Sequence, residues 1–257
     1  MIQRVTACQP RKTKQAIDLF FILHSMKRAV FILFIMVLAE SVVPAKAQTY
    51  VVKKIPENVM RLNGKGDNKA WNKAAVLSDF SFPWEKEKAP ATSFSALWDG
   101  KWLYCLYRVK DDSVITLVKN NNKIEVGASD RVEIFMARDS ALNPYYCLEM
   151  DAKGRVLDYR AFFYRKMDYA WQWPAKQLVI KTSAVKNGYI VELAISIKSL
   201  TGLGLLKNRR MLAGLFRAEC KNIKEGKAGL HWISWIKPDA PRPDFHIPSA
   251  FGELALE

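Results

Sequence analysis

The sequence predicts an all-β protein, an antiparallel two-sheet β-sandwich of the jelly-roll kind. From residue 48 onward, short runs of residues alternate between apolar and polar types, which is typical of strands that bury one face. Turn signals such as Asp99-Gly100 and Asn187-Gly188 separate neighbouring runs and predict β-hairpins. No long stretch repeats with the roughly 3.6-residue period of an amphipathic helix, so an α/β fold is not expected.

Each expected strand is bounded by a turn or a loop. Asp67 is expected to cap a short helical turn that carries Trp71, and residues 199–206 are expected to form another. Residues 110–128 and 165–176 are interpreted as loops. The expected strands cover residues 50–52, 92–98, 101–109, 130–137, 145–151, 155–164, 178–185, 189–197, 211–220, 230–236 and 251–256. The expected core residues are Val132, Ile134, Tyr146, Leu148, Ile190, Val191, Leu193, Ile195 and Leu215.

The first 47 residues are interpreted as a leader that is not part of the domain. Lys27 and Arg28 precede an apolar run and a small-residue Ala45-Lys46-Ala47 site, which together predict a signal peptide over residues 26–47. The apolar run is too short to span a membrane as a helix. We therefore expect a mature domain of residues 48–257, located in the periplasm or secreted, with no membrane span after removal of the signal peptide.

Composition limits the class of partner. The chain carries a formal charge of +15, and removal of the leader takes away five of these charges and leaves +10. Because the lysines are scattered and export is expected, nucleic acid is not the expected partner; acidic glycans or an anionic envelope surface fit better, beside a plain solubilising role. Cys105, Cys147 and Cys220 lie inside apolar runs, so buried thiols are favoured over a disulfide or a zinc site.

Alternation along the strands gathers charged residues on one expected sheet face, and tryptophans follow near strand ends. Aromatic rings can pack on apolar faces of a ligand, and charged groups can bind its polar groups in pairs. The alternative is a solvated sheet face with cross-strand ion pairs, and tryptophans that serve core packing. The candidate ligand-binding residues are Arg131, Glu133, Glu149, Arg160, Arg217, Trp171, Trp173, Trp232 and Trp235.

The order of several motifs resembles that of family 9 carbohydrate-binding modules, in the DOMON-like group of β-sandwiches. The motifs include Leu-Trp-Asp-Gly-Lys-Trp-Leu-Tyr at 97–104, Ser-Asp-Arg-Val-Glu-Ile-Phe at 129–135 and Phe-His-Ile-Pro at 245–248. The resemblance runs from Asn63 to Leu254. It implies an exported, non-catalytic protein that binds an oligo- or polysaccharide on a concave polar sheet face with tryptophan at its rim, and that supports polysaccharide breakdown.

One departure from the family pattern concerns the ligand. Sugar-binding members often carry Trp three residues before the Asp of the Asp-x-Val-Glu motif, and hold a sugar between it and a late Trp. Here that position is Gly127, and either Trp232 or Trp235 matches the late Trp. Glu149 stands where such members have a basic residue. An envelope structural or interaction domain that has lost the sugar site therefore stays open as an alternative.

Two other functions are considered, a glycoside hydrolase and a calcium-binding protein. Glu133 and Glu149 are the one carboxylate pair that could serve a glycoside hydrolase, but nearby cations are expected to keep both ionised, which is unsuitable for a general acid. An enzyme is therefore not the expected function. No cofactor is assigned; Asp111 and Asp112 are candidates for calcium, although their spacing does not match a calcium-binding loop.

Overall fold

The structure is a computed structural model that describes residues 48–257, so the expected signal peptide lies outside the described residues. The all-β prediction is confirmed. The helical elements are short: η1 (Lys69–Lys73), η2 (Lys123–Ala128), α2 (Ile197–Gly202) and η3 (Pro248–Ala250). The strands are β1 (Thr49–Lys54), β2 (Thr92–Trp98), β3 (Trp102–Lys110), β4 (Arg131–Ala137), β5 (Tyr145–Asp151), β6 (Val156–Phe162), β7 (Lys166–Asp168), β8 (Leu178–Val185), β9 (Gly188–Ser196), β10 (Arg210–Lys224), β11 (Lys227–Ser234) and β12 (Gly252–Leu256).

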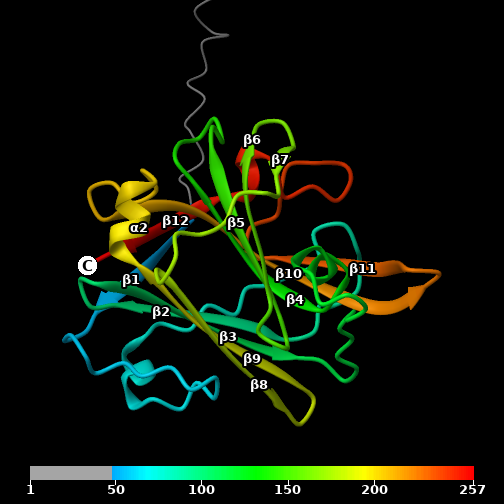
Figure 1. The fold of residues 1–257 in the computed structure, drawn as a ribbon, viewed down its shortest axis with the longest axis horizontal. Coiled ribbons are helices and arrows are strands. Elements are labelled where there is room, and N and C mark those ends of the chain that lie inside the picture. Colours follow the sequence, from blue (N-terminus) through cyan, green and yellow to red (C-terminus); the bar gives the residue numbers. More distant parts are fainter. Residues whose placement is uncertain (1–47) are drawn as a thin grey trace, which may run out of the picture. The chain divides into compact units, whose positions relative to one another are not determined.

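The strands form one curled, open sheet (Figure 1). Its order is β7-β6-β5-β4-β10-β12-β1-β2-β3-β9-β8, with β11 paired to β10. Strand β1 joins the two halves, because Thr49–Val52 pair with β12 and Lys53 and Lys54 pair with β2, both in parallel. A division into two separate sheets is therefore not confirmed. The antiparallel prediction fails at β1, since no hairpin connects β1 to either neighbour and its direction is not constrained by a tight turn.

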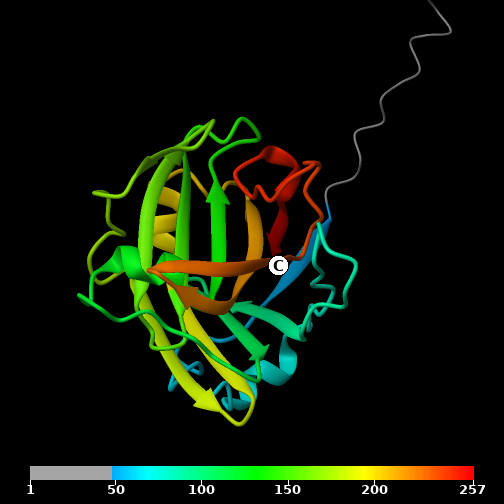
Figure 2. The same cartoon turned by 90° about the vertical axis from the view of Figure 1, so that its right-hand side faces the viewer.

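The main core lies between the two halves of the curled sheet, which face each other in Figure 2. Val132 and Leu148 from one half and Leu193 and Tyr107 from the other belong to one buried apolar cluster. All of the predicted core residues are buried. Ile190 is buried in a different cluster, on the outer face, because neighbouring side chains on a strand point to opposite faces.

Each half of the sheet also carries a covered outer face. Outside β3 and β9, the segment that holds Met60 and Trp71 packs on Leu106 and Ile190. Outside β4, β5, β6 and β10, residues 245–251 cover a second set of apolar side chains. Beside this second cover, a small pocket is lined by polar side chains of β4 and β5.

The structure corrects two local predictions. The cap of η1 is Asn68 and not Asp67, because the side chain of Asn68 accepts the Ala70 N–H at 2.9 Å, whereas Asp67 accepts from the Asn63 amide at 2.8 Å. Strand β7 lies inside the expected loop 165–176. The three cysteines of the described part are buried and free, as favoured. No helix among residues 48–257 is both long and apolar enough to cross a membrane.

Candidate functional site

Arg131, Glu133 and Glu149 form a buried charged cluster on the outer face of β4 and β5. Glu133 and Glu149 are directly opposite each other in the antiparallel ladder, so their side chains share a face. The guanidinium of Arg131 bridges them: Nε donates to Glu149 Oε2 at 2.6 Å, and Nη2 lies 2.9 Å from Glu133 Oε1. The hydroxyl of Tyr159 donates to the second oxygen of Glu149 at 2.9 Å. The prediction that these three charged residues share a face is confirmed.

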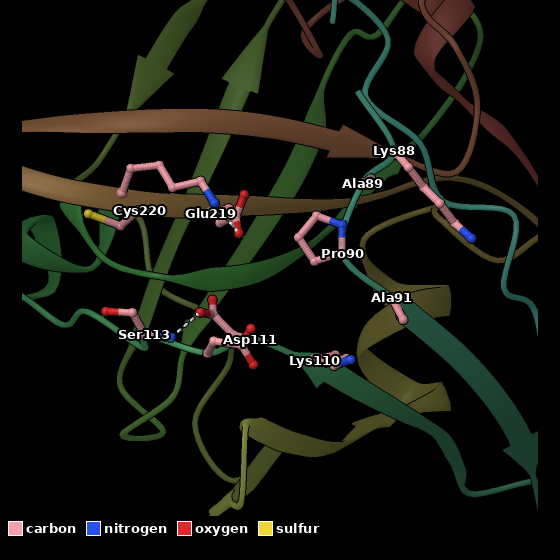
Figure 3. A pocket seen from close by; sticks show the side chains of 11 residues that line it. Lys88, Ala89, Pro90, Ala91, Lys110, Asp111, Ser113, Glu219 and Cys220 are labelled. Atoms are coloured by element: carbon pink, nitrogen blue, oxygen red, sulfur yellow. Dashed lines mark hydrogen bonds and ion pairs between the residues drawn. The ribbon is translucent and has the colours of Figure 1, made fainter. Parts of the chain in front are cut away.

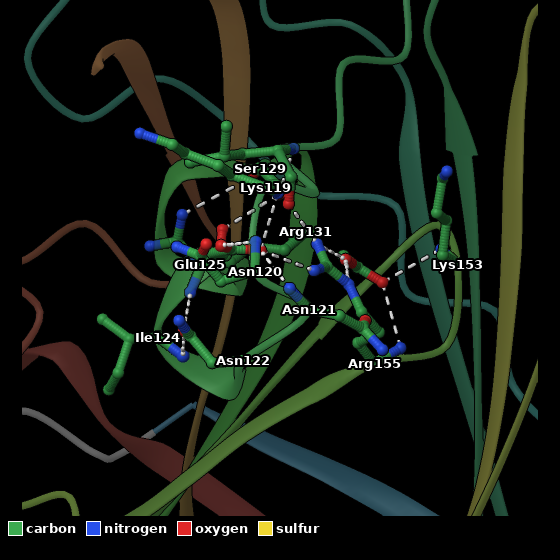
Figure 4. Close-up of polar contacts among 12 residues, drawn as sticks. Lys119, Asn120, Asn121, Asn122, Ile124, Glu125, Ser129, Arg131, Lys153 and Arg155 are labelled. Carbon is green, nitrogen blue, oxygen red and sulfur yellow. Dashed lines mark hydrogen bonds and ion pairs between the residues drawn. The ribbon is translucent and has the colours of Figure 1, made fainter.

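The segment before β4 fixes the position of Arg131. The Nη1 group of Arg131 donates to the carbonyl of Gly127 at 2.8 Å. That carbonyl belongs to η2, which is held by Glu125: its carboxylate accepts the backbone N–H groups of Lys119, Asn120 and Asn121 at 2.5 to 3.1 Å (Figure 4). A buried carboxylate with this many donors ties the preceding loop to η2. Gly127, which stands where sugar-binding family members often have tryptophan, therefore gives the cluster a backbone carbonyl as an acceptor.

Trp232 reaches the cluster across two strands. Register places Arg131, Ala218 and Trp232 in one cross-strand row on β4, β10 and β11. Because Ala218 is small, the half-buried indole of Trp232 lies over the guanidinium of Arg131, with 5.4 Å from Cζ to the ring centroid. This cation–π contact places an aromatic face at the edge of the charged cluster. Of the two candidates for the late tryptophan, Trp232 is the one beside Arg131.

A small pocket opens at this cluster, and we call it the Arg131 pocket. It has a volume of about 70 Å³. Its outer wall is an ion pair between Arg165, after β6, and Asp244, with 2.8 Å between Arg165 Nη1 and Asp244 Oδ1. Ligand pockets usually measure roughly 300–1,000 Å³, so this pocket is too small to enclose a ligand of ordinary size. The lining residues are Arg131, Glu133, Phe135, Glu149, Arg165, Trp232, Pro243, Asp244, Phe245 and His246.

Burial changes the protonation of two groups in this pocket. Burial, and then the charge of Glu149, raise the pKa of Glu133 to about 8, although Arg131 acts in the opposite direction. The expectation that nearby cations keep both carboxyls ionised is therefore wrong for Glu133. Burial, and then the positive charge of Arg165, lower the pKa of His246 to about 4. At neutral pH, the site thus offers a largely protonated Glu133 and a neutral imidazole.

Arg160 and Trp171 lie on the other face of the sheet. Arg160 is opposite Tyr146 in the ladder between β5 and β6, whereas Glu149 is opposite Leu157. A shift by one residue in register reverses the face of a strand side chain, so the pairing of β5 with β6 turns Arg160 away from the face of Glu149. Arg160 instead pairs with Asp168 at 2.8 Å, and Trp171 packs on Tyr146 with 4.9 Å between ring centroids.

Trp173 and Trp235 serve the core and are not at the Arg131 pocket. Trp173 is buried, and its indole Nε1 donates to Ser199 Oγ at 3.2 Å. Trp235 is buried in the main core, just after the end of β11. These two tryptophans therefore do not border the charged face, because both rings are on the side of the sheet that faces the opposite half. The expectation that at least one of the four candidate tryptophans overhangs this face is met by Trp232.

Arg217 lies on the inner face and joins the two halves of the sheet. It is opposite Val132, one position away from the Arg131–Ala218 row, so it points into the core side. Its Nη2 donates to Asp111 Oδ2 at 2.8 Å, and its Nη1 donates to the carbonyl of Lys110 at 3.1 Å. The prediction that Arg217 shares the face of Arg131 is wrong.

A second pocket lies beside Arg217, and we call it the Asp111 pocket (Figure 3). It has a volume of about 470 Å³, and Asp111 and Glu219 both line it. The two carboxylates approach the same nitrogen of Arg217, at 2.8 and 3.8 Å. Because Asp111 is bound by a guanidinium, it does not fit the proposed role of a calcium ligand. The described residues contain no group of three or more acidic, His or Cys side chains that could hold a metal ion.

Comparison with known families identifies the domain. The family model of carbohydrate family 9 binding domain-like proteins matches residues 62–257. The chain belongs to this family. The resemblance in motif order is therefore confirmed, and it spans most of the described residues. A search of curated protein sequences gave no match.

Solved structures share the fold. A protein from Bacteroides uniformis, assigned as carbohydrate-binding, matches with a TM-score of 0.65 and 19% identity, over 82% of this chain and 100% of that one. A family 9 carbohydrate-binding module from Caldicellulosiruptor kristjanssonii in complex with cellotriose matches with a TM-score of 0.53 and 16% identity, over 82% of this chain and 94% of that one. A family 9 carbohydrate-binding module from the same organism in complex with glucose matches with a TM-score of 0.53 and 15% identity, over 82% of this chain and 96% of that one.

Sequence reasoning did not find the outer wall of the Arg131 pocket. Arg165 and Asp244 come from loops far apart in the chain, and both line the pocket together with His246. The one sequence signal that pointed to this wall is the Phe-His-Ile-Pro motif at 245–248, which forms part of the family pattern. Loop positions carry no period, so alternation cannot place them.

Proposed function

We propose that this chain is a non-catalytic carbohydrate-binding protein, and that a sugar ring docks at the mouth of the Arg131 pocket. The observation that carries this proposal is the joint placement of Arg131, Glu133, Glu149 and Trp232 on one outer face, with an indole beside paired charged groups. Family membership and the sugar ligands of two solved relatives support it.

The chemistry of the mouth suits a polyhydroxylated ring. Oε1 of Glu133 is buried and lies 2.9 Å from Nη2 of Arg131 without a well-aligned hydrogen bond, so it can still accept from a second donor. A protonated carboxyl can also donate a hydrogen bond, which suits a sugar hydroxyl because the hydroxyl can both donate and accept. The indole of Trp232 gives an apolar face for C–H groups of the ring. Placement on paired strands holds these groups at fixed spacing.

The wider role follows from the expected leader. We propose that the domain acts in the periplasm or outside the cell and supports polysaccharide breakdown by holding oligo- or polysaccharide, not by cleaving it. The raised pKa of Glu133 is the one feature that favours a hydrolase, because a general acid must be protonated at working pH. Against hydrolysis, Glu133 and Glu149 share one guanidinium and face a pocket of about 70 Å³.

Calorimetric titration against a panel of mono- and oligosaccharides, including glucose and cellotriose, tests the proposal. Replacement of Glu133 by Ala should weaken binding by about 1–3 kcal/mol, the usual effect of a lost hydrogen bond to a charged or buried group. Trp232→Ala should weaken it by about 1 kcal/mol. Arg160→Ala, on the other face, is the matched control and should bind like the wild type. Absence of binding across the panel would favour the alternative, an interaction domain that has lost its sugar site.

A further inference from the structure

Exposed aromatic side chains gather at one place on the described part of the chain. Phe163, Tyr164 and Tyr169 are 45%, 51% and 45% exposed, and they are the exposed aromatic residues among positions 48–257. All three belong to the segment from the end of β6 to just after β7 (Figure 1). Single exposed apolar rings scattered over a surface are ordinary, whereas several exposed rings close together mark a binding surface.

This aromatic surface is continuous with the Arg131 pocket. Tyr164 donates its hydroxyl to Asp244, and its ring lies 5.9 Å from the guanidinium of Arg165. Both Asp244 and Arg165 line the pocket. The surface therefore starts at the outer wall of the pocket and extends away from it.

Tyr169 approaches the cluster from a second side. Its ring lies 5.0 Å from that of Tyr159, which is the residue that donates to Glu149. Burial, and then the charge of Glu149, raise the pKa of the Tyr169 hydroxyl. Nearly half of the side chain remains exposed, so part of the ring is free to contact a ligand.

We propose that Phe163, Tyr164 and Tyr169 form an aromatic platform for the sugar units that follow the one at the pocket mouth. The ligand class is then an oligosaccharide chain and not a free monosaccharide. This inference rests on the proposed function. Flat rings pack on the C–H faces of pyranoses, and the hydroxyls of two tyrosines with the charges of Arg165 and Asp244 can bind the sugar hydroxyls between them.

Titration of matched pairs of monosaccharide and trisaccharide tests the platform. Suitable probes are glucose with cellotriose or maltotriose, xylose with xylotriose, and mannose with mannotriose. For the pair that binds, the wild type should bind the trisaccharide at least about tenfold more tightly than the monosaccharide. The double variant Tyr164→Ala/Tyr169→Ala should lose about tenfold for the trisaccharide, the scale of two aromatic contacts, and under about twofold for the monosaccharide.

Two further variants make the outcome specific. Tyr169→Phe keeps the ring and should retain most of the affinity, so an equal loss in Tyr169→Phe and Tyr169→Ala would contradict ring packing. Val179→Ala removes an exposed apolar side chain on β8, at the other end of the strand order, and should change nothing. Thermal unfolding of each variant verifies that the fold is kept.

The failures of the two proposals are distinguishable. If the wild type binds no saccharide of the panel, the proposed function fails and the platform fails with it. If the wild type binds monosaccharide and trisaccharide equally, or the double variant binds the trisaccharide like the wild type, only the platform is refuted; these aromatic residues would then serve another partner, such as a protein.

Discussion

Two buried arginines, Arg131 and Arg217, lie almost side by side on β4 and β10 and have different roles. Arg131 pairs with Glu133 and Glu149 within one half of the sheet, and its cluster meets a pocket bordered by an indole. Arg217 binds Asp111 and the carbonyl of Lys110, which belong to the other half. The difference comes from one step of register: Arg131 is opposite Ala218, so Arg217 points the other way.

This comparison shows how placement sets the role of a charged residue. Arg217, on the inner face, binds Asp111 and the carbonyl of Lys110 from the opposite half, beside Glu219 of its own strand, so it ties the two halves together. A guanidinium on the outer face can meet a ligand. Each is buried, so each needs its carboxylates for stability whatever else it does.

Replacement of Arg217 by Ala should have the largest effect on stability. It would leave Asp111 buried without its cation and remove the link between the halves, so the free energy of unfolding should fall by about 3–5 kcal/mol. Denaturant unfolding measures this. A loss below about 1 kcal/mol would show that Arg217 does not hold the halves together.

Glu133→Gln should change the pH dependence of stability. The pKa of Glu133 is raised in the folded chain to about 8, so between about pH 4.5 and 8 the folded state retains a proton that the unfolded chain has lost. Stability from this group is therefore full below about pH 4.5 and is lost as pH rises toward 8.

The measurement is unfolding of both proteins across this range. The variant should gain stability relative to the wild type as pH rises, on the order of 4 kcal/mol by pH 8. A constant difference between the two curves would contradict a protonated Glu133 in the folded state.

His246→Asn should change the pH dependence of stability in the opposite direction to Glu133→Gln. The pKa of His246 is lowered to about 4 in the folded chain, so between about pH 6.5 and 4 the unfolded chain binds a proton that the folded chain does not. Stability from this group is full above about pH 6.5 and is lost as pH falls. The variant, whose side chain can still form a hydrogen bond with Tyr145, should lose less stability on acidification than the wild type, by about 3 kcal/mol at pH 4. Equal acid sensitivity of both proteins would exclude this role.

Arg160→Ala should have the smallest effect. Its ion pair with Asp168 has both side chains more than a third exposed, so solvent screens it. The free energy of unfolding should fall by less than about 1 kcal/mol, which denaturant unfolding can compare with the Arg217 variant. A loss as large as that of Arg217→Ala would mean that exposure does not distinguish these arginines.

The sequence predicted the strands well because alternation and turns are local properties. Strand β5 lies at the expected residues, and the hairpin across Asp99-Gly100 is present. Glu133 and Glu149 were correctly placed together. Arg160 and Arg217 were not, because pairing register is a non-local property that single strands do not specify.

The outer wall of the pocket and the aromatic platform were beyond prediction for another reason. Asp244 and Arg165 meet only because two irregular segments fold onto the same edge of the sheet. Tyr169 was placed in a loop, where its neighbour Tyr159 could not be foreseen. Contacts between loops depend on the whole fold, so residue patterns do not report them.

The decisive measurement is a structure of the chain bound to the saccharide that titration selects. We expect a sugar ring at the mouth of the Arg131 pocket, with a hydroxyl within hydrogen-bond distance of Glu133 and the ring beside the indole of Trp232. A sugar bound in the Asp111 pocket, whose volume of about 470 Å³ is the larger of the two, would contradict it.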